Sequence, residues 1–460
     1  MASPAQSPLG VERHLKRDIT LLQALGVSFQ SVVGAGVVAL TGISIGLTGG
    51  GTPLAYALAT VAVIVYSLPI VALGSAMPLV GGRYSYAARL LSPSTGFATM
   101  WLSILVTIQL SLLALAAANS VHALLPSVPV APMALAVMTI FFLANLFGAT
   151  FSNRLGIGLS VVMLAAFLLY GFVGVPQVHW EVLADVAPNG IENFVAAAAL
   201  LTFAATGGSY VAEIGHEMKR PGRDIPLAVI GGTAMAGLLY VFMAIVSTGV
   251  LPVSEVAGKP MSVVAQHLLP SGGFAFFVLG GAVVAVVGAL NALLLTATKP
   301  VLAAVGDGWL PKRLGAVNQR FGTPHWLLFL LYVIGVLPVL FGLSLEGIAK
   351  ASSIAAGPML AIIIIASYRL RGRYPDLHAA APFKLGARTH LVIAVLGTGV
   401  LAAQTYLLVT KVTTSIAVAL VVWLALGLGL WLARRRHVAA VLRARHAQPA
   451  TMEGALRVPT

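Results

Sequence analysis

Two long stretches of this chain contain no charged side chain. Residues 19–82 and residues 90–153 hold no Asp, Glu, Lys or Arg, and each stretch is 64 residues long. A membrane-spanning helix needs roughly 20 apolar residues, so each stretch has room for two spans and the turn between them. Of the 460 residues, 59% are hydrophobic and only 9% are charged, which excludes an ordinary soluble domain. We therefore expect an all-α integral membrane protein.

The apolar segments and the turn residues between them predict twelve membrane helices. Turns such as Thr52-Pro53 and Pro221-Gly222 separate the segments. The expected ranges are 19–47, 53–79, 96–124, 131–150, 154–175, 193–214, 226–250, 273–304, 325–343, 347–368, 390–410 and 413–433.

The distribution of the basic residues along the chain supports a count of twelve helices. When the loops are placed alternately on the two sides, all but three of the 27 basic residues fall on the side that holds both termini, and the exceptions are Lys259, Lys350 and Lys411. Positive residues favour the cytoplasmic side. We therefore expect a multi-pass protein of the plasma membrane with cytoplasmic tails at residues 1–18 and 434–460. The net charge of +14 is then a topology signal and gives no reason to expect nucleic-acid binding. Cysteine is absent, so disulfide and thiolate chemistry are excluded.

Two of the predicted helices carry a glycine cluster at their middle. The first helix holds Gly34-Ala35-Gly36, and the sixth holds Thr206-Gly207-Gly208-Ser209. In lipid every backbone N–H and C=O needs a partner, so a helix is interrupted only where the freed groups line a polar cavity or meet other protein. We therefore expect helices 1 and 6 to be discontinuous and to meet at a binding site.

The spacing of the two breaks predicts an internal repeat. They lie five spans apart, and because five is odd the two five-helix units have opposite orientations. The expected units are residues 19–175 and 176–370, followed by residues 371–433, which hold a loop and helices 11 and 12.

Four stretches at the expected spacing resemble one family, the amino acid–polyamine–organocation transporters. They are Val33 to Val37; Pro78 to Tyr86 with Gly96-Phe97; Phe203 to Tyr210 with Glu217 to Pro226; and Lys299 to Pro311 with Asn318 and Gly322 to Pro324. The resemblance covers about residues 15–430. It implies the LeuT-type fold of five plus five inverted helices with two helices appended, and transport by alternating access.

The breaks supply the chemistry that an amino acid needs. The half-helix after a break presents unpaired N–H groups to a carboxylate, and the carbonyls that end the preceding half-helix suit an ammonium group. The resemblance places Phe203 as a gate over the substrate, Leu290 at the substrate side chain, and Ser209 where some cation-exchanging relatives carry an acid. The candidate substrate-binding residues are Val33, Gly34, Ala35, Gly36, Phe203, Ala204, Thr206, Gly207, Gly208, Ser209, Leu290 and Asn291.

Structural interpretations of the same residues stay open. The glycines could serve close helix packing, and Phe203 could be a core aromatic. Polar groups inside apolar spans could line the pocket or make hydrogen bonds between helices, namely Gln109, Asn291, Ser352 and Ser353.

Glu213 is the one acid that falls inside a predicted span, and an ionisable group there is a candidate functional residue. It is either a proton relay or an interfacial residue paired with Lys219, Arg220 or His216. Some proton-coupled relatives carry a lysine inside helix 5, and residues 156–174 contain none. Coupling to H⁺, coupling to Na⁺ and plain exchange, by symport or antiport, are therefore all open.

These observations favour a permease for an amino acid, expected to be neutral because no charge is available in the pocket for a side chain. The first alternative is transport of a related amine such as ethanolamine or a polyamine. A membrane-embedded enzyme would need a catalytic constellation that the sequence lacks, and a non-transporting sensor is a further alternative. We expect no cofactor, and a composition rich in Ala, Val, Leu, Gly and Arg suggests a bacterial source. The sequence does not give the oligomeric state.

Overall fold

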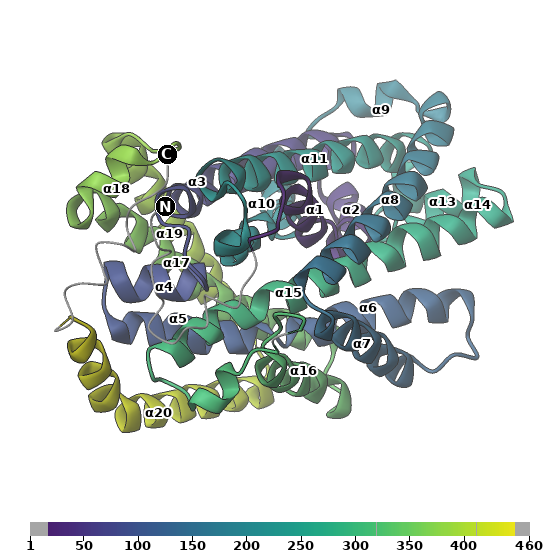
Figure 1. Ribbon diagram of the computed structural model, residues 1–460. Coiled ribbons are helices and arrows are strands. Elements are labelled where there is room, and N and C mark those ends of the chain that lie inside the picture. Colours follow the sequence, from purple (N-terminus) through teal and green to yellow (C-terminus); the bar gives the residue numbers. More distant parts are fainter. Residues whose placement is uncertain (1–16, 319, 411, 447–460) are drawn as a thin grey trace.

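The computed structural model describes residues 17–318, 320–410 and 412–446, and every named element in them is a helix (Figure 1). Pairing of the β type is confined, within these residues, to two isolated bridges, Ile19 with Met218 and Asn318 with Thr323. The expectation of an all-helical chain is confirmed.

The α-helices are α1 (Leu21–Val32), α2 (Ala35–Thr48), α3 (Thr52–Ala76), α4 (Gly82–Leu90), α5 (Pro93–Val106), α6 (Gln109–Leu124), α7 (Val130–Leu146), α8 (Ala149–Gly174), α9 (Trp180–Ala184), α10 (Ile191–Ala205), α11 (Pro221–Gly249), α12 (Val253–Val256), α13 (Ser262–Leu268), α14 (Ser271–Phe276), α15 (Val284–Gly306), α16 (His325–Leu340), α17 (Leu345–Arg373), α18 (Pro375–Ala380), α19 (Ala387–Val409) and α20 (Thr414–His446). Shorter 3₁₀ segments are η2 (Gly49–Gly51), η3 (Val175–Gln177), η4 (Gly208–Glu217) and η6 (Lys312–Gly315), and η5 (Phe277–Val283) is a π-helix.

Eight helical segments among the described residues are long and apolar enough to cross a membrane. Four shorter apolar helices accompany them: Leu21–Val32, Val130–Leu146, Ile191–Thr202 and His325–Leu340. Each of the twelve predicted ranges falls on one of these segments or on a run of adjoining helices. A multi-pass membrane protein is thereby confirmed.

Three irregularities inside the predicted ranges were not expected from the sequence. The range 96–124 is divided at Thr107 and Ile108, where α5 gives way to α6. The range 273–304 contains the π-helix η5 between α14 and α15. The second half of the sixth predicted helix is the 3₁₀ helix η4, which is more tightly wound than an α-helix.

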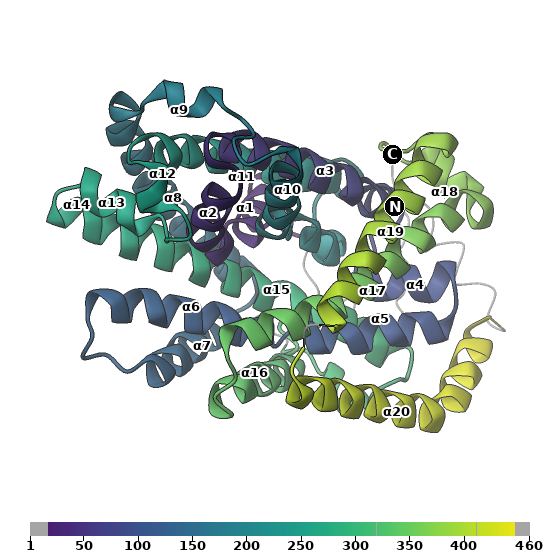
Figure 2. The same ribbon diagram turned by 180° about the vertical axis from the view of Figure 1, so that it is seen from behind.

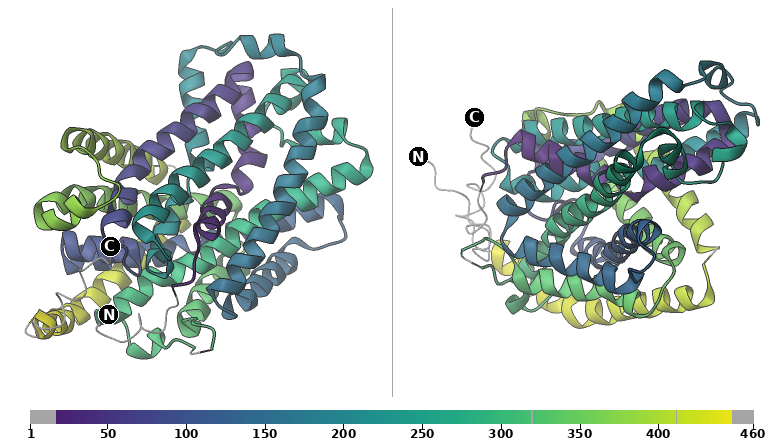
Figure 3. Two further views of the ribbon diagram at one scale, coloured as in Figure 1. Left: turned by 45° about the horizontal axis from the view of Figure 1, so that its top comes forward. Right: turned by 90° about the vertical axis from the view of Figure 1, so that its right-hand side faces the viewer.

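The long helices run side by side, and the views of Figure 3 show the same arrangement from two further directions. Helix α11 packs along α3 and α1, while α2 lies against α10. Helix α20 lies along the outer edge beside α5, as the rear view in Figure 2 shows, and the rest of the protein covers little of it. The helices that carry the two glycine clusters therefore pack against each other and against α3 and α11, whereas α20 is peripheral.

The start of α1 is fixed by local chemistry and by the end of η4. Thr20 and Gln23 form a capping box, in which the Thr20 N–H donates to Gln23 Oε1 at 2.9 Å. The Ile19 N–H donates to the Glu217 carbonyl at 3.0 Å, and the Lys219 N–H donates to the Ile19 carbonyl at 3.0 Å. The helix that carries the first glycine cluster is thus tied at its beginning to the segment that follows the second.

Candidate substrate site

The first helix is interrupted at the first glycine cluster. Helix α1 ends at Val32 and α2 begins at Ala35, with Val33 and Gly34 between them. Gly34 has an extended backbone, and no side chain caps the start of α2. The first N–H groups of a helix have no partner within the helix, so the beginning of α2 offers donors to a ligand.

The second interruption crosses the first at close range. Helix α10 ends at Ala205, and η4 begins at Gly208 after Thr206 and Gly207. Gly207 has φ +136°, and a Cβ atom added there would lie 2.1 Å from the Ser31 carbonyl oxygen. Only glycine combines that backbone conformation with so close an approach. The two breaks therefore touch each other through their backbones.

Tyr240 of α11 ties the two breaks together. Its hydroxyl donates to the Val32 carbonyl at 2.8 Å and lies 3.4 Å from the Ala204 carbonyl. These two carbonyls belong to the last turns of α1 and α10, where the helix leaves them without internal partners. A buried tyrosine thus satisfies backbone groups that both interruptions set free.

Replacing Tyr240 by phenylalanine is expected to lower the stability of the folded protein by about 1–2 kcal/mol, because two buried carbonyls lose a donor. The melting temperature of the purified protein in detergent measures this loss. Tyr170→Phe is the matched control, since the hydrogen bond of its hydroxyl is with Ser247, which keeps a bond to the Met243 carbonyl. An equal or larger loss in Tyr170→Phe would contradict the role assigned to Tyr240.

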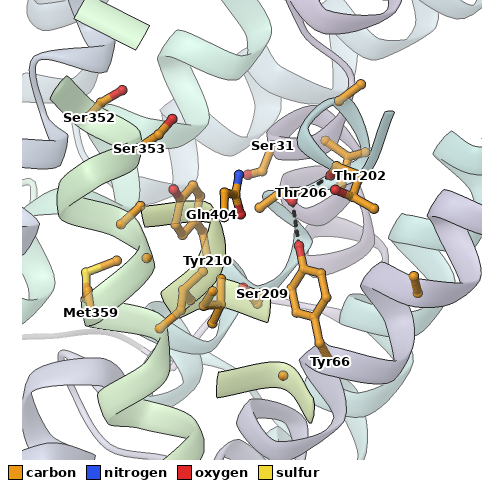
Figure 4. A pocket seen from close by; sticks show the side chains of 18 of the residues that line it. Ser31, Tyr66, Thr202, Thr206, Ser209, Tyr210, Ser352, Ser353, Met359 and Gln404 are labelled. Atoms are coloured by element: carbon orange, nitrogen blue, oxygen red, sulfur yellow. Dashed lines mark hydrogen bonds between the residues drawn. The ribbon is translucent and has the colours of Figure 1, made fainter. Parts of the chain in front are cut away.

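A cavity of about 440 Å³ lies against the two breaks, and we call it the central cavity. The walls come from α1, α2, α3, α6, α10, η4, α15, α17 and α19, with Arg83 from α4. Several of its lining side chains on α19 are exposed, among them Leu396 and Val400, so the cavity is open along that helix. Its polar lining residues include Arg83 and Gln109. The other polar lining residues are labelled in Figure 4: Ser31, Tyr66, Thr202, Thr206, Ser209, Tyr210, Ser352, Ser353 and Gln404.

Tyr66 of α3 connects the cavity wall to the second break. Its hydroxyl is 2.5 Å from Thr206 Oγ1, which in turn donates to the Thr202 carbonyl at 2.8 Å, as the dashed lines of Figure 4 show. The side chain of Thr206 is therefore held in the last turn of α10, beside the cavity.

The residues predicted for the site divide into three groups. Five of them line the central cavity: Gly34, Gly36, Ala204, Thr206 and Ser209. Five lie outside its lining: Val33, Gly207, Gly208, Leu290 and Asn291. The side chains of Ala35 and Phe203 lie outside the described part of the structure, so the gate expected at Phe203 stays a prediction.

Asn291 belongs to a buried hydrogen-bond network between helices. Its Oδ1 accepts from Asn145 Nδ2 and from Ser152 Oγ, each at 2.9 Å, and its Nδ2 donates to the Ser152 carbonyl at 3.1 Å. Of the two interpretations open for Asn291, the structure therefore supports hydrogen bonding between helices. Gln109, Ser352 and Ser353, for which the same two interpretations were open, line the cavity instead.

Glu213 is buried and pairs with Arg83. The Arg83 Nε atom lies 3.4 Å from Glu213 Oε1, and the Arg83 backbone N–H lies 3.3 Å from both carboxylate oxygens. Sequence reasoning had offered Lys219, Arg220 and His216 as partners, and the ion pair that the structure gives to Glu213 is with none of these. Nothing in the sequence indicated this partner, because Arg83 in α4 and Glu213 in η4 are 130 residues apart in the chain.

Arg83 also corrects the expectation that the pocket holds no charge. Its guanidinium is among the lining groups of the central cavity, where Nη2 donates to Ser209 Oγ at 3.3 Å. It lies 4.3 Å from the centre of the Tyr210 ring. The carboxylate of Glu213 balances its charge, so the pair as a whole is neutral.

Tyr66, Tyr210 and Gln404 line the cavity and were not predicted. Gln404 carried a signal that could have found it, because a polar amide inside an apolar span usually faces a cavity or a polar partner. Nothing in the sequence distinguished the two tyrosines from other aromatic residues of a membrane helix.

Comparison with known proteins adds a family signal that covers most of the chain. Residues 19–437 match the family described as "Amino acid permease". The branched-chain amino acid permease BcaP of Bacillus subtilis is 26% identical over 397 residues, which is 80% of this chain and 84% of that protein. The methylthioribose transporter of the same organism is 25% identical over 389 residues, 79% of this chain and 82% of that protein. The low-affinity putrescine importer PlaP of Escherichia coli K12 is 29% identical over 216 residues, 44% of this chain and 47% of that protein.

Proposed function

Because the chain belongs to the amino acid permease family of membrane transporters, we propose that it is a secondary transporter that moves a neutral amino acid across the plasma membrane by alternating access. The proposal includes twelve spans in the LeuT-type arrangement, with inverted units at 19–175 and 176–370 and two further helices in 371–433. The observation that carries it is the cavity lying where two interrupted helices cross.

The substrate carboxylate would bind the start of α2. Gly34 and Gly36 line the cavity there, and the uncapped N–H groups of the first turn suit a negative charge. The ammonium group would bind carbonyls at the ends of α1 and α10, near Val33, Phe203 and Ala204. The Ala204 carbonyl keeps one lone pair beyond its contact with Tyr240.

A neutral substrate is favoured by the charges around the cavity. Among the described lining residues there is no carboxylate, and the one cation, Arg83, is already paired. A diamine would leave its second ammonium without a counter-charge, which is costly away from water. This observation weighs against the alternative of a polyamine, although a relative over less than half of the chain is named a putrescine importer.

We place the coupling proton on Glu213, with Na⁺ coupling and exchange as alternatives. A buried carboxylate that loses its one cationic partner is driven to take up a proton, so a movement that separates α4 from η4 would couple protonation to transport. The charged and titratable groups that interact with it are Arg83, Tyr86 and Tyr210. In Glu213→Gln, uptake driven by a pH gradient should be lost while counterflow of labelled substrate persists. Loss of both, or of neither, would contradict the assignment.

Both termini are proposed to be cytoplasmic, because that orientation puts all but three of the 27 basic residues on the inner side.

A thermal-shift screen of the purified protein against amino acids and their decarboxylated amines tests the proposal. A ligand at about 100 times its dissociation constant stabilises the folded state by about 2.7 kcal/mol. We expect a shift with a neutral amino acid and none with the corresponding amine, since only the amino acid carries the carboxylate for α2. Shifts with amines alone would overturn the amino acid assignment and favour the amine alternative.

A further inference from the structure

A second, smaller cavity lies next to the central cavity. It measures about 20 Å³, which is room for roughly one water molecule, and we call it the small pocket. Its polar lining comes from Ser103, Thr107, Glu213 and Thr296, together with Arg83. The central cavity is therefore followed, on the side of α4, by a small space whose wall includes the buried carboxylate.

Four side chains separate the two cavities. Arg83, Tyr210, Leu293 and Met359 line both of them, and they come from α4, η4, α15 and α17 respectively. A residue that faces two cavities is the wall between them. We call these four residues the partition.

One half of the partition is held by charge. Arg83 reaches across Tyr210 and Ser209 toward the cavity, while its other contacts fix it to Glu213 behind. Both carboxylate oxygens of Glu213 also face the Arg83 backbone N–H in the first turn of α4, where a helix favours negative charge. Because the pair is buried, its separation would expose two charges to a poorly solvated site.

The other half of the partition is held weakly. Leu293 and Met359 are buried apolar side chains, and the polar contact made to Met359 is a hydroxyl–sulfur contact of 3.1 Å from Ser103. Met359 has several rotatable bonds and a soft thioether, so it can be displaced at little cost. The charged half therefore decides whether the partition stays closed.

We propose that the partition is the gate through which substrate leaves the central cavity toward the small pocket, and that the Arg83–Glu213 pair is its latch. The inference rests on the proposed function only in taking the central cavity as the transport site. Arg83 is in this role a positioning residue, which holds Tyr210 and Ser209 across the exit. Opening requires that α4 and η4 separate, and this joins the two cavities into one passage.

The natural absence of cysteine allows a direct test. Thr296→Cys places a reporter in the small pocket, and Ser353→Cys places one in the central cavity. The probe is 2-(trimethylammonium)ethyl methanethiosulfonate, applied to each single-cysteine protein in detergent. The latch is removed by R83Q together with E213Q, which abolishes the attraction without leaving one charge buried alone.

We expect the double change to speed modification of the cysteine at position 296 about tenfold, the factor that corresponds to losing ~1.4 kcal/mol of closure. The rate at position 353 should stay within about twofold, since that reporter already faces the open cavity. An unchanged rate at position 296 in a protein that still melts cooperatively would overturn the proposal. Equal acceleration at both positions would also overturn it, because it would mean general loosening.

Met359→Ala is the second variant, and it thins the partition without touching the charged pair. It too should raise the rate at position 296 and not at position 353. If the double variant does not melt cooperatively, an unchanged rate in Met359→Ala overturns the partition by itself. Neither measurement uses a substrate, so a negative ligand screen and a negative labelling result are separate outcomes.

Discussion

Gly207→Ala is expected to disrupt the crossing of the two broken helices and to leave little folded protein. A side chain at φ +136° is strained by roughly 1–3 kcal/mol, and forcing an extra atom into a packed site costs roughly 1–3 kcal/mol more. The new Cβ would lie 2.1 Å from the Ser31 carbonyl oxygen and 2.7 Å from its carbon, so backbone must move. A whole domain is stable by only about 5–15 kcal/mol.

The yield of monodisperse protein and its melting temperature measure this effect. Gly158→Ala is the matched control, because Gly158 lies in α8 with no atom within 4 Å of an added Cβ. Its φ is not positive, and alanine favours a helix over glycine by up to about 1 kcal/mol. The control should therefore melt at or slightly above the temperature of the parent. Similar melting of Gly207→Ala and the parent would refute the close contact between the breaks.

The interruptions could be predicted because glycine clusters act locally. Each cluster lowers the cost of leaving helical geometry, which allowed both breaks to be predicted, although the pair Gly231-Gly232 lies inside the continuous helix α11. The close approach of Gly207 to Ser31 could not be predicted, because it depends on how α1 and η4 cross. The bend at Thr107 has no glycine or proline beside it. The pair Gly280-Gly281 lies inside η5, but a glycine pair does not by itself indicate a π-helix.

The sequence also could not predict which face of α15 lines the cavity. Ala289 and Leu293 line the cavity, and they lie four residues apart on one face of the helix. The resemblance had selected Leu290, and its polar side chain inside an apolar span had selected Asn291. Neither lines the cavity: Leu290 packs in a buried cluster and Asn291 bonds to Asn145. The rotation of a helix that is apolar all round cannot be determined from its own pattern.

The ion-pair partner of Glu213 is a third feature that the sequence could not predict. Nearby basic residues were the natural candidates from the sequence, whereas the fold brings Arg83 from a different helix. An ion pair over such a separation leaves no periodic or compositional trace. The same reasoning explains why the charge in the cavity wall was missed, since Arg83 reads in the sequence as one of many basic residues in a loop.

Lys299→Met is expected to destabilise the protein by about 3–5 kcal/mol, because it leaves the carboxylate of Glu217 buried without its counter-charge. The Lys299 Nζ atom lies 2.5 Å from Glu217 Oε1, and the two side chains are only 4% and 6% exposed. Methionine keeps most of the volume and removes the charge. The melting temperature in detergent should fall by several degrees.

The double variant Lys299→Met with Glu217→Gln separates the cost of an unpaired charge from the worth of the pair. Replacing both members of a buried pair is often close to neutral, so the double variant should regain most of the lost stability. Lys350→Met is the surface control, because its partner Glu346 is 76% exposed and water screens that pair. It should melt as the parent does. A single Lys299→Met variant that melts like the parent, or a double variant no more stable than the single one, would show that burial of Glu217 does not depend on Lys299. In that case the joint between the end of η4 and α15 would have to be held by apolar packing alone.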